Sequence, residues 1–283
     1  MSRRILLLGG SGQVGTALIK RLDEVVAPSR QEFELTMARS EMARDLVDTT
    51  RPDAIINCAA YTAVDQAEEE TNVANVVNGD AVGVLGEIAA DFGVPFVTYS
   101  TDYVFDGTAG RPYVESARTN PINAYGRSKL IGERLALEAN PEALVIRTSW
   151  VISGTHRNFV ATMLRLAGER RSLTVVNDKY GCPTMADDLA VATIEALDLA
   201  ATGLLHLTNQ GATTWFDLAT AAILEAGHDP GLLSPCTTAE YPTRARRPAY
   251  AVLGSERITD IGISPLPPWR DSLPAVVDLL TAT

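Results

Sequence analysis

A tyrosine and a lysine four residues apart carry the most specific chemical signal in the sequence. Tyr125 and Lys129 are separated by about one helical turn, so a helix would present both on one face. A phenol beside an ammonium group suits proton donation, because a nearby cation lowers the phenol pKa from about 10 toward neutrality. No other tyrosine has a lysine four residues on, and the remaining lysines are Lys20 and Lys179. We therefore predict that Tyr125 donates a proton with support from Lys129; the alternative is an exposed pair on a surface helix.

Two hydroxyl side chains, Ser100 and Thr101, end an apolar run that begins at Phe96. Reduction of a carbonyl group turns its oxygen into an alkoxide as hydride arrives, and that oxygen needs a proton donor and a second hydrogen-bond donor. Tyr125 fits the first role and Thr101 the second. Lys129 would supply the charge beside the phenol and also hold the ribose next to the nicotinamide. The pattern therefore predicts carbonyl reduction with a nicotinamide cofactor, catalysed by Thr101, Tyr125 and Lys129.

Three glycines, Gly9, Gly12 and Gly15, directly follow the first predicted strand at residues 5–8. A dinucleotide pyrophosphate needs a backbone without Cβ atoms in its way and amide groups aimed at it from a helix N-terminus. A lone glycine triplet is weak evidence, since turns also collect glycine. Here a strand precedes the glycines and a helix is expected over residues 16–22, which is the context that a dinucleotide-binding loop requires.

The residues after the second predicted strand, 25–27, indicate which nicotinamide cofactor is used. An acidic residue at this place usually grips the ribose hydroxyls of NAD, but the chain continues Pro28-Ser29-Arg30. No carboxylate there would repel a 2′-phosphate, and Arg30 could pair with one. The sequence favours NADPH and leaves NADH as the alternative; Arg30 as a solvated loop residue is the other interpretation.

Short apolar runs alternate with helical patterns through the first half of the chain, as in βαβ units that build a parallel sheet. We expect strands at residues 5–8, 25–27, 54–57, 96–100 and 144–146. We expect helices at residues 16–22, 40–50, 73–92 and 124–139. The predicted fold class is therefore α/β, a Rossmann-type doubly wound parallel sheet with a smaller C-terminal substrate-binding lobe.

The second half of the chain has a looser pattern. Helices are expected at residues 159–167, 187–199, 216–226 and 271–280, and apolar runs at 173–176 and 204–207. The proline-rich segment 230–268, with Arg244, Arg246 and Arg247, indicates a loop-rich cap. We predict an NAD(P)-binding domain over residues 1–150 and a smaller sugar nucleotide-binding lobe over 151–283, with sheet elements returning around 173–208.

Composition limits the partners. The 283 residues are 46% hydrophobic, enough for a full core, and 24 basic against 35 acidic residues give a net charge of −11, which disfavours nucleic acid. Cys58, Cys182 and Cys236 are odd in number and lack metal-ligand spacing, so neither disulfides nor a metal site are expected. The apolar stretch near the N-terminus is too short for a signal peptide or a membrane span, so we expect a soluble, cytoplasmic protein without membrane contact.

Six ordered motifs give the chain a family resemblance over nearly its whole length. They are Gly9-x-x-Gly12-Gln13-x-Gly15, the segment 57–65 (NCAAYTAVD), the segment 100–105 (STDYVF), Tyr125-x-x-x-Lys129, the segment 147–150 (RTSW) and the segment 178–184 (DKYGCPT). With these motifs the sequence resembles the extended short-chain dehydrogenase/reductases and, more narrowly, the dTDP-4-dehydrorhamnose reductase family.

The resemblance implies NADPH-dependent reduction of the C4 ketone of a dTDP-sugar and assigns residues to two sites. Cofactor contacts are implied for the glycine loop and the segment after the third strand: Gly9, Gly12, Gln13, Val14, Gly15, Arg30, Ala60, Tyr61, Thr62, Tyr125 and Lys129. Sugar-nucleotide contacts are implied for Thr62, Val64, Thr101, Asp102, Tyr103, Tyr125 and Trp150. An indole face such as that of Trp150 suits the C–H face of a sugar, although an isolated tryptophan is more often a core residue.

Two positions depart from the family pattern. Some members form a magnesium-bridged dimer through a glutamate just after the glycine loop, where this chain has Thr16-Ala17-Leu18. A serine commonly follows the Arg-Pro pair of the cap, but Arg247-Pro248 is followed here by Ala249-Tyr250-Ala251. A homodimer is compatible with the sequence, and its magnesium-bridged form is in doubt.

Three other functions compete with this prediction. The 4,6-dehydratases of the same fold use an Asp-Glu pair after the threonine, and Asp102 is followed here by Tyr103, which favours reduction over elimination. A 4-ketoreductase of a related dTDP-6-deoxyhexose or dihydrostreptose pathway would use the same catalytic residues. A non-catalytic, nucleotide-binding regulatory subunit would be free to lose Thr101, Tyr125 or Lys129, all of which this chain keeps.

Overall fold

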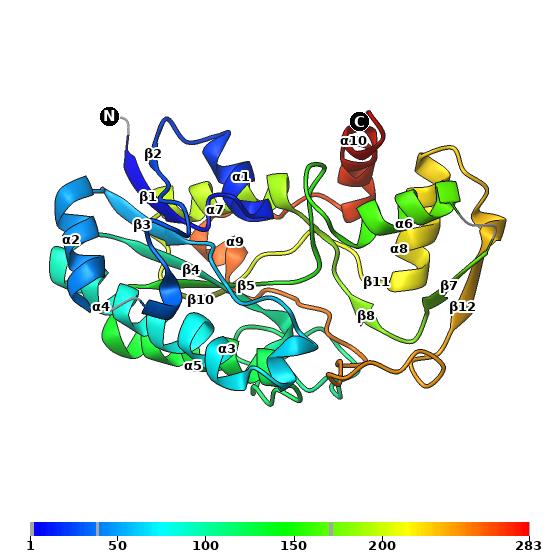
Figure 1. Ribbon diagram of the computed structural model, residues 1–283, viewed down its shortest axis with the longest axis horizontal. Helices are drawn as coiled ribbons and strands as arrows, with labels where there is room; N and C mark the ends of the chain where they lie inside the picture. Colours follow the sequence, from blue (N-terminus) through cyan, green and yellow to red (C-terminus); the bar gives the residue numbers. More distant parts are fainter. Residues whose placement is uncertain (1–2, 38–39, 170–171, 283) are drawn as a thin grey trace.

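A six-stranded parallel sheet forms the centre of the larger lobe (Figure 1). The computed structural model describes residues 3–37, 40–169 and 172–282. The strands are β1 (Arg4–Leu8), β2 (Glu24–Val26), β3 (Ala54–Asn57), β4 (Phe96–Thr101), β5 (Leu144–Thr148) and β10 (Gly203–His206). Their order is β2-β1-β3-β4-β5-β10, and every neighbouring pair is parallel. The predicted doubly wound α/β fold is confirmed.

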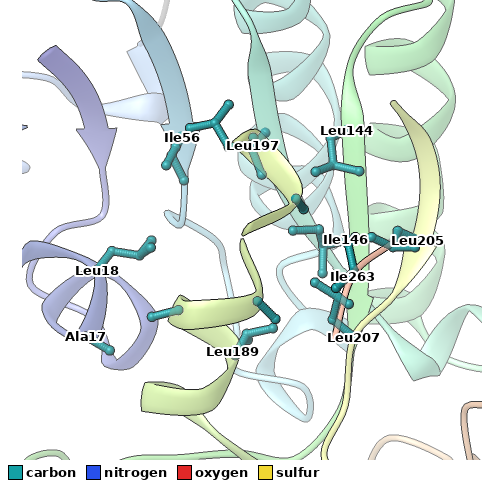
Figure 2. Packing of buried hydrophobic residues seen from close by; sticks show 14 of the residues in the cluster. Ala17, Leu18, Ile56, Leu144, Ile146, Leu189, Leu197, Leu205, Leu207 and Ile263 are labelled. Carbon is teal, nitrogen blue, oxygen red and sulfur yellow. The ribbon is translucent and has the colours of Figure 1, made fainter. Parts of the chain in front are cut away.

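Helices cover both faces of this sheet, which explains why its inner strands are continuous apolar runs instead of alternating patterns. One face carries α1 (Gln13–Ile19) and α7 (Ala186–Asp198); the other carries α2 (Ser40–Thr50), α4 (Ala81–Phe92) and α5 (Ala124–Ala139) (Figure 1). Figure 2 shows the core on the first face, where Leu18 and Leu189 from the helices meet Ile56 and Ile146 from the strands.

The helix expected at residues 73–92 is composite. It begins as α3 (Thr71–Asn75), widens into the π-helical turn η3 (Val76–Asp80) and continues as α4, which ends at Gly93 in the left-handed region, with φ +65°. Such π-turns are rare and frequently mark functional sites. Short 3₁₀ turns complete this lobe: η1 (Leu35–Met37), η2 (Gln66–Glu68) and η4 (Asp102–Val104).

The smaller lobe is built around three helices that share a second apolar core, α6 (Phe159–Glu169), α8 (Trp215–Glu225) and α10 (Trp269–Thr281). Its strands form two-stranded sheets: β6 (Val151–Ile152) with β9 (Thr184–Met185), β8 (Tyr180–Gly181) with β11 (Thr213–Thr214), and β7 (Leu173–Val176) with β12 (Leu233–Cys236). The expected loop-rich cap also holds η5 (Pro230–Leu232) and α9 (Ile258–Ile261).

The sheet elements expected to return around residues 173–208 divide between the two lobes. The strand β10 joins the large sheet beside β5, whereas β7 pairs with β12 at the far end of the smaller lobe (Figure 1). The boundary predicted at residue 150 stays a prediction. Within the described ranges, no helix combines the length and the apolar character needed to cross a membrane.

Candidate active site

The carboxyl ends of the central strands gather the predicted site residues at one edge of the sheet. The strand β1 leads into the glycine loop, β3 ends at Asn57, β4 ends at Thr101 and Trp150 follows β5 by two residues. The strand order reverses between β1 and β3, and ligands of open α/β sheets bind outside the carboxyl ends of the strands at such a switch point. The fold therefore places the glycine loop and the hydroxyl of Thr101 where a ligand can meet both.

Two of the three loop glycines are required by the fold itself. A Cβ on Gly9, which has φ +77°, would lie 2.5 Å from the backbone nitrogen of Ala59, and a Cβ on Gly15 would lie 2.3 Å from the carbonyl oxygen of Gly9. Gly12 is different, because the nearest atom to its Cβ would be the Gly9 oxygen at an ordinary 3.4 Å. It also caps α1 without any side-chain hydrogen bond. The Gly12 amide donates to the Gly9 carbonyl at 3.0 Å, so the open space at Gly12 and the amides in the first turn of α1 fit a pyrophosphate group.

The side chain of Gln13 ties the glycine loop to the smaller lobe. Its Nε2 donates to the carbonyl of Val151 at 3.0 Å, and its Oε1 accepts from the backbone nitrogen of Ser153 at 2.9 Å. Asn158 donates to the same oxygen at 3.1 Å. Since the Gln13 amide is engaged in this way, its backbone is the part left for a cofactor. The neighbouring Val14 packs against the core of the large lobe.

A buried asparagine that sequence reasoning missed connects the segment after β3 to helix α5. Asn78 accepts from the backbone nitrogen of Tyr61 at 2.8 Å and donates to the Tyr61 carbonyl at 2.9 Å. Its Nδ2 also donates to the Ser128 hydroxyl, which donates in turn to the carbonyl of Tyr125. Asn78 thus fixes the backbone between Ala60 and Thr62 relative to the predicted proton donor. The Asn-Gly pair inside an apolar helical pattern was the signal that could have identified it.

Helix α5 begins so that Tyr125 lies in its first turn and Lys129 one turn later. Asn123 caps the helix by accepting from the nitrogen of Gly126 at 2.7 Å. Gly126 allows a close approach, since a Cβ there would lie 2.1 Å from the Tyr103 carbonyl oxygen. The rings of Tyr103 and Tyr125 meet edge to face, with centroids 5.9 Å apart. The structure therefore brings together the predicted groups from β4 and α5.

Burial dominates the titration of both groups on α5. It raises the pKa of Tyr125 to about 12. A hydrogen bond with Thr101 acts in the opposite direction, and the charge of Asp102 adds to the rise. It lowers the pKa of Lys129 to about 8, with Glu133 acting in the opposite direction. The expected lowering of the Tyr125 pKa by Lys129 is not seen in this structure, because loss of water destabilises the phenolate more than its neighbours stabilise it. The phenol is protonated at neutral pH, as a proton donor must be.

Thr101 and Asp102 form a buried pair directly after β4. The Thr101 hydroxyl donates to Oδ1 of Asp102 at 2.9 Å and accepts from the backbone nitrogen of Tyr103 at 3.2 Å. Asp102 is 2% exposed, and its second oxygen, Oδ2, has no hydrogen-bond partner among the described residues. Burial raises the pKa of Asp102 to about 7. A buried carboxyl group with an unpaired oxygen can either form a hydrogen bond with a ligand or carry a proton.

The cap reaches the same area through an arginine that was not among the predicted site residues. Arg247 forms two hydrogen bonds with the carboxylate of Asp65, at 2.7 and 3.1 Å, across 182 residues of sequence. Burial lowers the Arg247 pKa, but the hydrogen bonds to Asp65 and the neighbouring Tyr103 hydroxyl outweigh burial and raise that pKa. The segment that carries Thr62 and Val64 therefore lies beneath the cap, with the exposed Thr62 and the half-buried Val64 beside Asp65.

Trp150 has a strained backbone and a stacked ring. Its φ of +45° lies in the left-handed region, where residues other than glycine are uncommon and which tends to occur at functional sites. The indole stacks on that of Trp215 with centroids 3.6 Å apart and planes 13° from parallel. A Cβ on Gly181 would lie 2.5 Å from the Trp150 ring, so the glycine makes room for it. Trp150 is half-buried against the core of the smaller lobe, and Trp215 is the positioning contact that sequence reasoning missed.

Arg30 lies in the loop after β2, away from tight packing. Its side chain is 81% exposed and pairs with the carboxylate of Glu34 one turn on. Its predicted pairing with a 2′-phosphate therefore requires the guanidinium to leave the half-buried carboxylate of Glu34.

A cavity of about 340 Å³ lies apart from these residues, and none of the predicted site residues lines it. Its wall includes Cys182, His206 and Tyr250. The His206 ring faces the carbonyl oxygens of Tyr113 and Gly254, and Cys182 donates to the carbonyl of Leu253, so both side chains have protein partners.

Comparison with known proteins agrees with this geometry. The family described as the RmlD substrate binding domain matches residues 3–282. The dTDP-4-dehydrorhamnose reductase of Burkholderia thailandensis is 42% identical, over 98% of this chain and 99% of its own length. The dTDP-4-keto-6-deoxy-D-glucose reductase of Streptomyces niveus is 38% identical, over 100% and 99%. The crystal structure of dTDP-4-dehydrorhamnose reductase from Bacillus anthracis in complex with NADP superposes with a TM-score of 0.94 at 32% identity, covering 98% and 99% of the two chains. The chain therefore belongs to the dTDP-4-dehydrorhamnose reductase family.

Proposed function

We propose that this protein reduces the C4 ketone of dTDP-4-dehydro-L-rhamnose to give dTDP-L-rhamnose, with NADPH as the reductant. The observation that carries the proposal is a protonated phenol, Tyr125, beside the hydroxyl of Thr101 at the carboxyl end of the sheet, with the buried Lys129 one turn along the same helix. The names of the full-length relatives and the NADP in the Bacillus anthracis structure support it.

The glycine loop and its neighbours are proposed to hold the cofactor. Gly9 and Gly12 would leave room for the pyrophosphate, the backbone amides from Gln13 to Gly15 in the first turn of α1 would receive it, and Arg30 would receive the 2′-phosphate. The segment from Ala60 to Thr62 would lie along the nicotinamide half, and Lys129 would hold its ribose. When bound, the reduced nicotinamide supplies the hydride.

The protein's own groups complete the reduction at the ketone oxygen. As negative charge develops there, the Tyr125 hydroxyl gives its proton to that oxygen and Thr101 donates a hydrogen bond to it. The ammonium of Lys129, one turn along α5, stabilises the phenolate left on Tyr125. Asp102, Tyr103, Trp150 and the residues from Thr62 to Val64 are proposed to line the sugar pocket.

The experiment is a reaction of the purified protein with NADPH and dTDP-4-dehydro-L-rhamnose. We expect loss of the nicotinamide absorbance only when both are present, and an NMR spectrum of the product that shows dTDP-L-rhamnose. A parallel reaction with NADH measures the cofactor preference. If the protein binds NADPH tightly but reduces no dTDP-4-ketosugar, the proposed reduction is wrong and the function is that of a regulatory subunit.

A 4-ketoreductase for a related dTDP-6-deoxyhexose or dihydrostreptose is the second candidate. It is favoured because the Streptomyces niveus relative, named for dTDP-4-keto-6-deoxy-D-glucose, is almost as similar as the rhamnose enzymes. The catalytic groups would be identical, and the choice would lie in the cap, where Ala249-Tyr250-Ala251 departs from the family pattern. The configuration at C4 of the product, read by NMR, separates the two candidates.

We further propose a reducing, cytoplasmic location, supported by three free cysteines, Cys58, Cys182 and Cys236. A homodimer is the proposed assembly, on family resemblance alone. Light scattering of the purified protein, with and without magnesium, tests the assembly directly.

A further inference from the structure

The Thr101 hydroxyl has one proton, which it can donate either to Asp102 or to the ketone oxygen of a substrate. In the structure the proton goes to Oδ1 of Asp102, 2.9 Å away. One lone pair of the hydroxyl oxygen is already used, because the backbone nitrogen of Tyr103 donates to it. The Tyr125 hydroxyl also lies within hydrogen-bond reach of Thr101; once it points to the ketone oxygen, the second lone pair is open and a protonated Asp102 could donate into it.

The direction of this proton decides what Thr101 can do for a substrate. An ionised carboxylate only accepts hydrogen bonds, so it keeps the Thr101 proton for itself. A protonated carboxyl group can donate to the Thr101 oxygen instead, and the Thr101 proton then turns outward toward the ketone oxygen. Stabilisation of a developing alkoxide needs the second arrangement.

We propose that Asp102 is a positioning residue whose protonated form turns the Thr101 hydroxyl proton toward the substrate carbonyl. The inference rests on the reduction proposed above, since it assigns a partner to one of its hydrogen-bond donors. It adds a residue that acts through Thr101.

The surroundings of Asp102 favour the protonated form. Its side chain is 2% exposed and Oδ2 has no partner among the described residues. The titratable groups that face it are Tyr103 beside it, Tyr125 from α5 and Cys182 from the loop between β8 and β9, and each of these is neutral when protonated. No cation in the described part of the chain stabilises the Asp102 carboxylate, because the Arg247 guanidinium contacts Tyr103 instead. Burial without a cation raises a carboxyl pKa.

The proposal predicts a pH dependence with a definite sign. The pKa of Asp102 is raised to about 7, so the active arrangement is present below that pH and is lost above it. We expect kcat/KM to fall by about tenfold per pH unit once Asp102 is ionised. Lys129 adds a second fall near pH 8 as it loses its charge, and every variant that keeps Lys129 shares this fall, so the difference between variants isolates Asp102.

The first experiment compares the pH profiles of the unmodified protein and three variants. Asp102→Asn has an amide that can donate to Thr101 at every pH, so its profile should lack the fall near pH 7 and keep only the one near pH 8. Thr101→Val has no hydroxyl to turn, so its lower rate should also lack the fall near pH 7. Thr101→Ser keeps the hydroxyl and should keep that fall. A fall near pH 7 that persists in Thr101→Val would overturn the proposal, because Asp102 would then act without Thr101.

The second experiment needs no turnover, and a single variant assigns its signal. Carbon-13 NMR of the aspartate carboxyl groups in the unmodified protein should show one group that titrates near neutrality, and Asp102→Asn should remove that signal alone. A spectrum in which every aspartate is ionised at about pH 6 would overturn the proposal even in a fully active enzyme. If the titrating carboxyl is present but the protein reduces no dTDP-ketosugar, the proposed function fails and the proton arrangement stands.

Discussion

At the scale of single residues, Tyr125 has the clearest chemical role to test. Replacing it with phenylalanine removes the proton donor but keeps the ring that packs edge to face against Tyr103. We expect kcat to fall by about 10²–10⁴-fold, with NADPH affinity nearly unchanged. Single-turnover kinetics and a fluorescence titration with NADPH measure the two quantities. The exposed Tyr241 provides the control substitution to phenylalanine, and a Tyr125→Phe enzyme as fast as that control would contradict the assignment.

Lys129 is predicted to lower stability while it serves function. Its pKa is about 8 in the folded protein and 10.5 in its ordinary state, so between these values the unfolded chain binds more protons. Stability therefore rises with pH across that window, and the full penalty, at most about 3 kcal/mol, is present below pH 8. Lys129→Met should raise the free energy of unfolding at neutral pH, should lose this advantage above about pH 10.5, and should weaken both NADPH binding and turnover.

Urea unfolding at neutral and alkaline pH, followed by circular dichroism, measures this difference. Lys20→Met is the matched control, because Lys20 is exposed at the end of α1. An equal effect of the two substitutions at neutral pH would mean that burial of Lys129 does not destabilise the fold.

At the scale of elements, Gly126 sets how closely helix α5 approaches the end of β4. A methyl group there would lie 2.1 Å from the Tyr103 carbonyl oxygen, so Gly126→Ala must push the helix and Tyr125 outward. Misplacement of a catalytic group by about 1 Å can lower rates about 10²-fold, and we expect a loss of that size. Gly168→Ala in α6 is the control: nothing lies near its added methyl group, so it should stabilise by about 0.5–1 kcal/mol. Assays and melting curves of both variants distinguish displacement from a general effect of alanine.

A buried ion pair joins α5 to β5 behind the site. Arg147 donates to both oxygens of Glu133, at 2.8 and 2.6 Å, and both side chains are nearly inaccessible. Glu133→Gln leaves the Arg147 charge buried without its partner and should destabilise the protein by about 3–5 kcal/mol. Chemical denaturation measures the change. The double variant Glu133→Gln with Arg147→Met should recover much of the loss, and its failure to do so would show that the charge is not the cause.

At the scale of the whole molecule, the pair of Arg247 with Asp65 is one of the contacts between the cap and the large lobe, beside the apolar packing of Ile263 and Leu266. Both side chains are partly exposed, 25% and 46%, so the pair should add less than about 1 kcal/mol to stability. Its value lies in position, because Arg247 also contacts Tyr103. Asp65→Ala should therefore raise KM for the sugar nucleotide while Tm changes little. Glu169→Ala, which breaks the exposed pair with Arg165, should change neither quantity, and equal KM values for the two variants would contradict the role of the cap.

The architecture of the large lobe was predictable because its signals are local. Apolar runs of three or four residues between turn residues became β1, β3 and β5, and the helix expected at 124–139 has those bounds in α5. The π-turn at Val76–Asp80 was not predictable from the spacing of apolar residues, because one extra residue in a helical turn hardly changes that spacing. The run at 173–176 was recognised as a strand, but its partner, β12, is fixed by packing in the smaller lobe.

The sequence by itself determined the family, the doubly wound sheet and the order of the catalytic groups, because residue type and spacing act through short-range geometry. Only the tertiary structure decided how those groups behave. The upward shift of the Tyr125 pKa, the bridge that Asn78 makes to Tyr61 and Ser128, and the stacking of Trp150 on Trp215 depend on which surfaces lose water and which distant residues meet. Desolvation and contact are properties of the folded chain in space, and spacing along the sequence does not specify them.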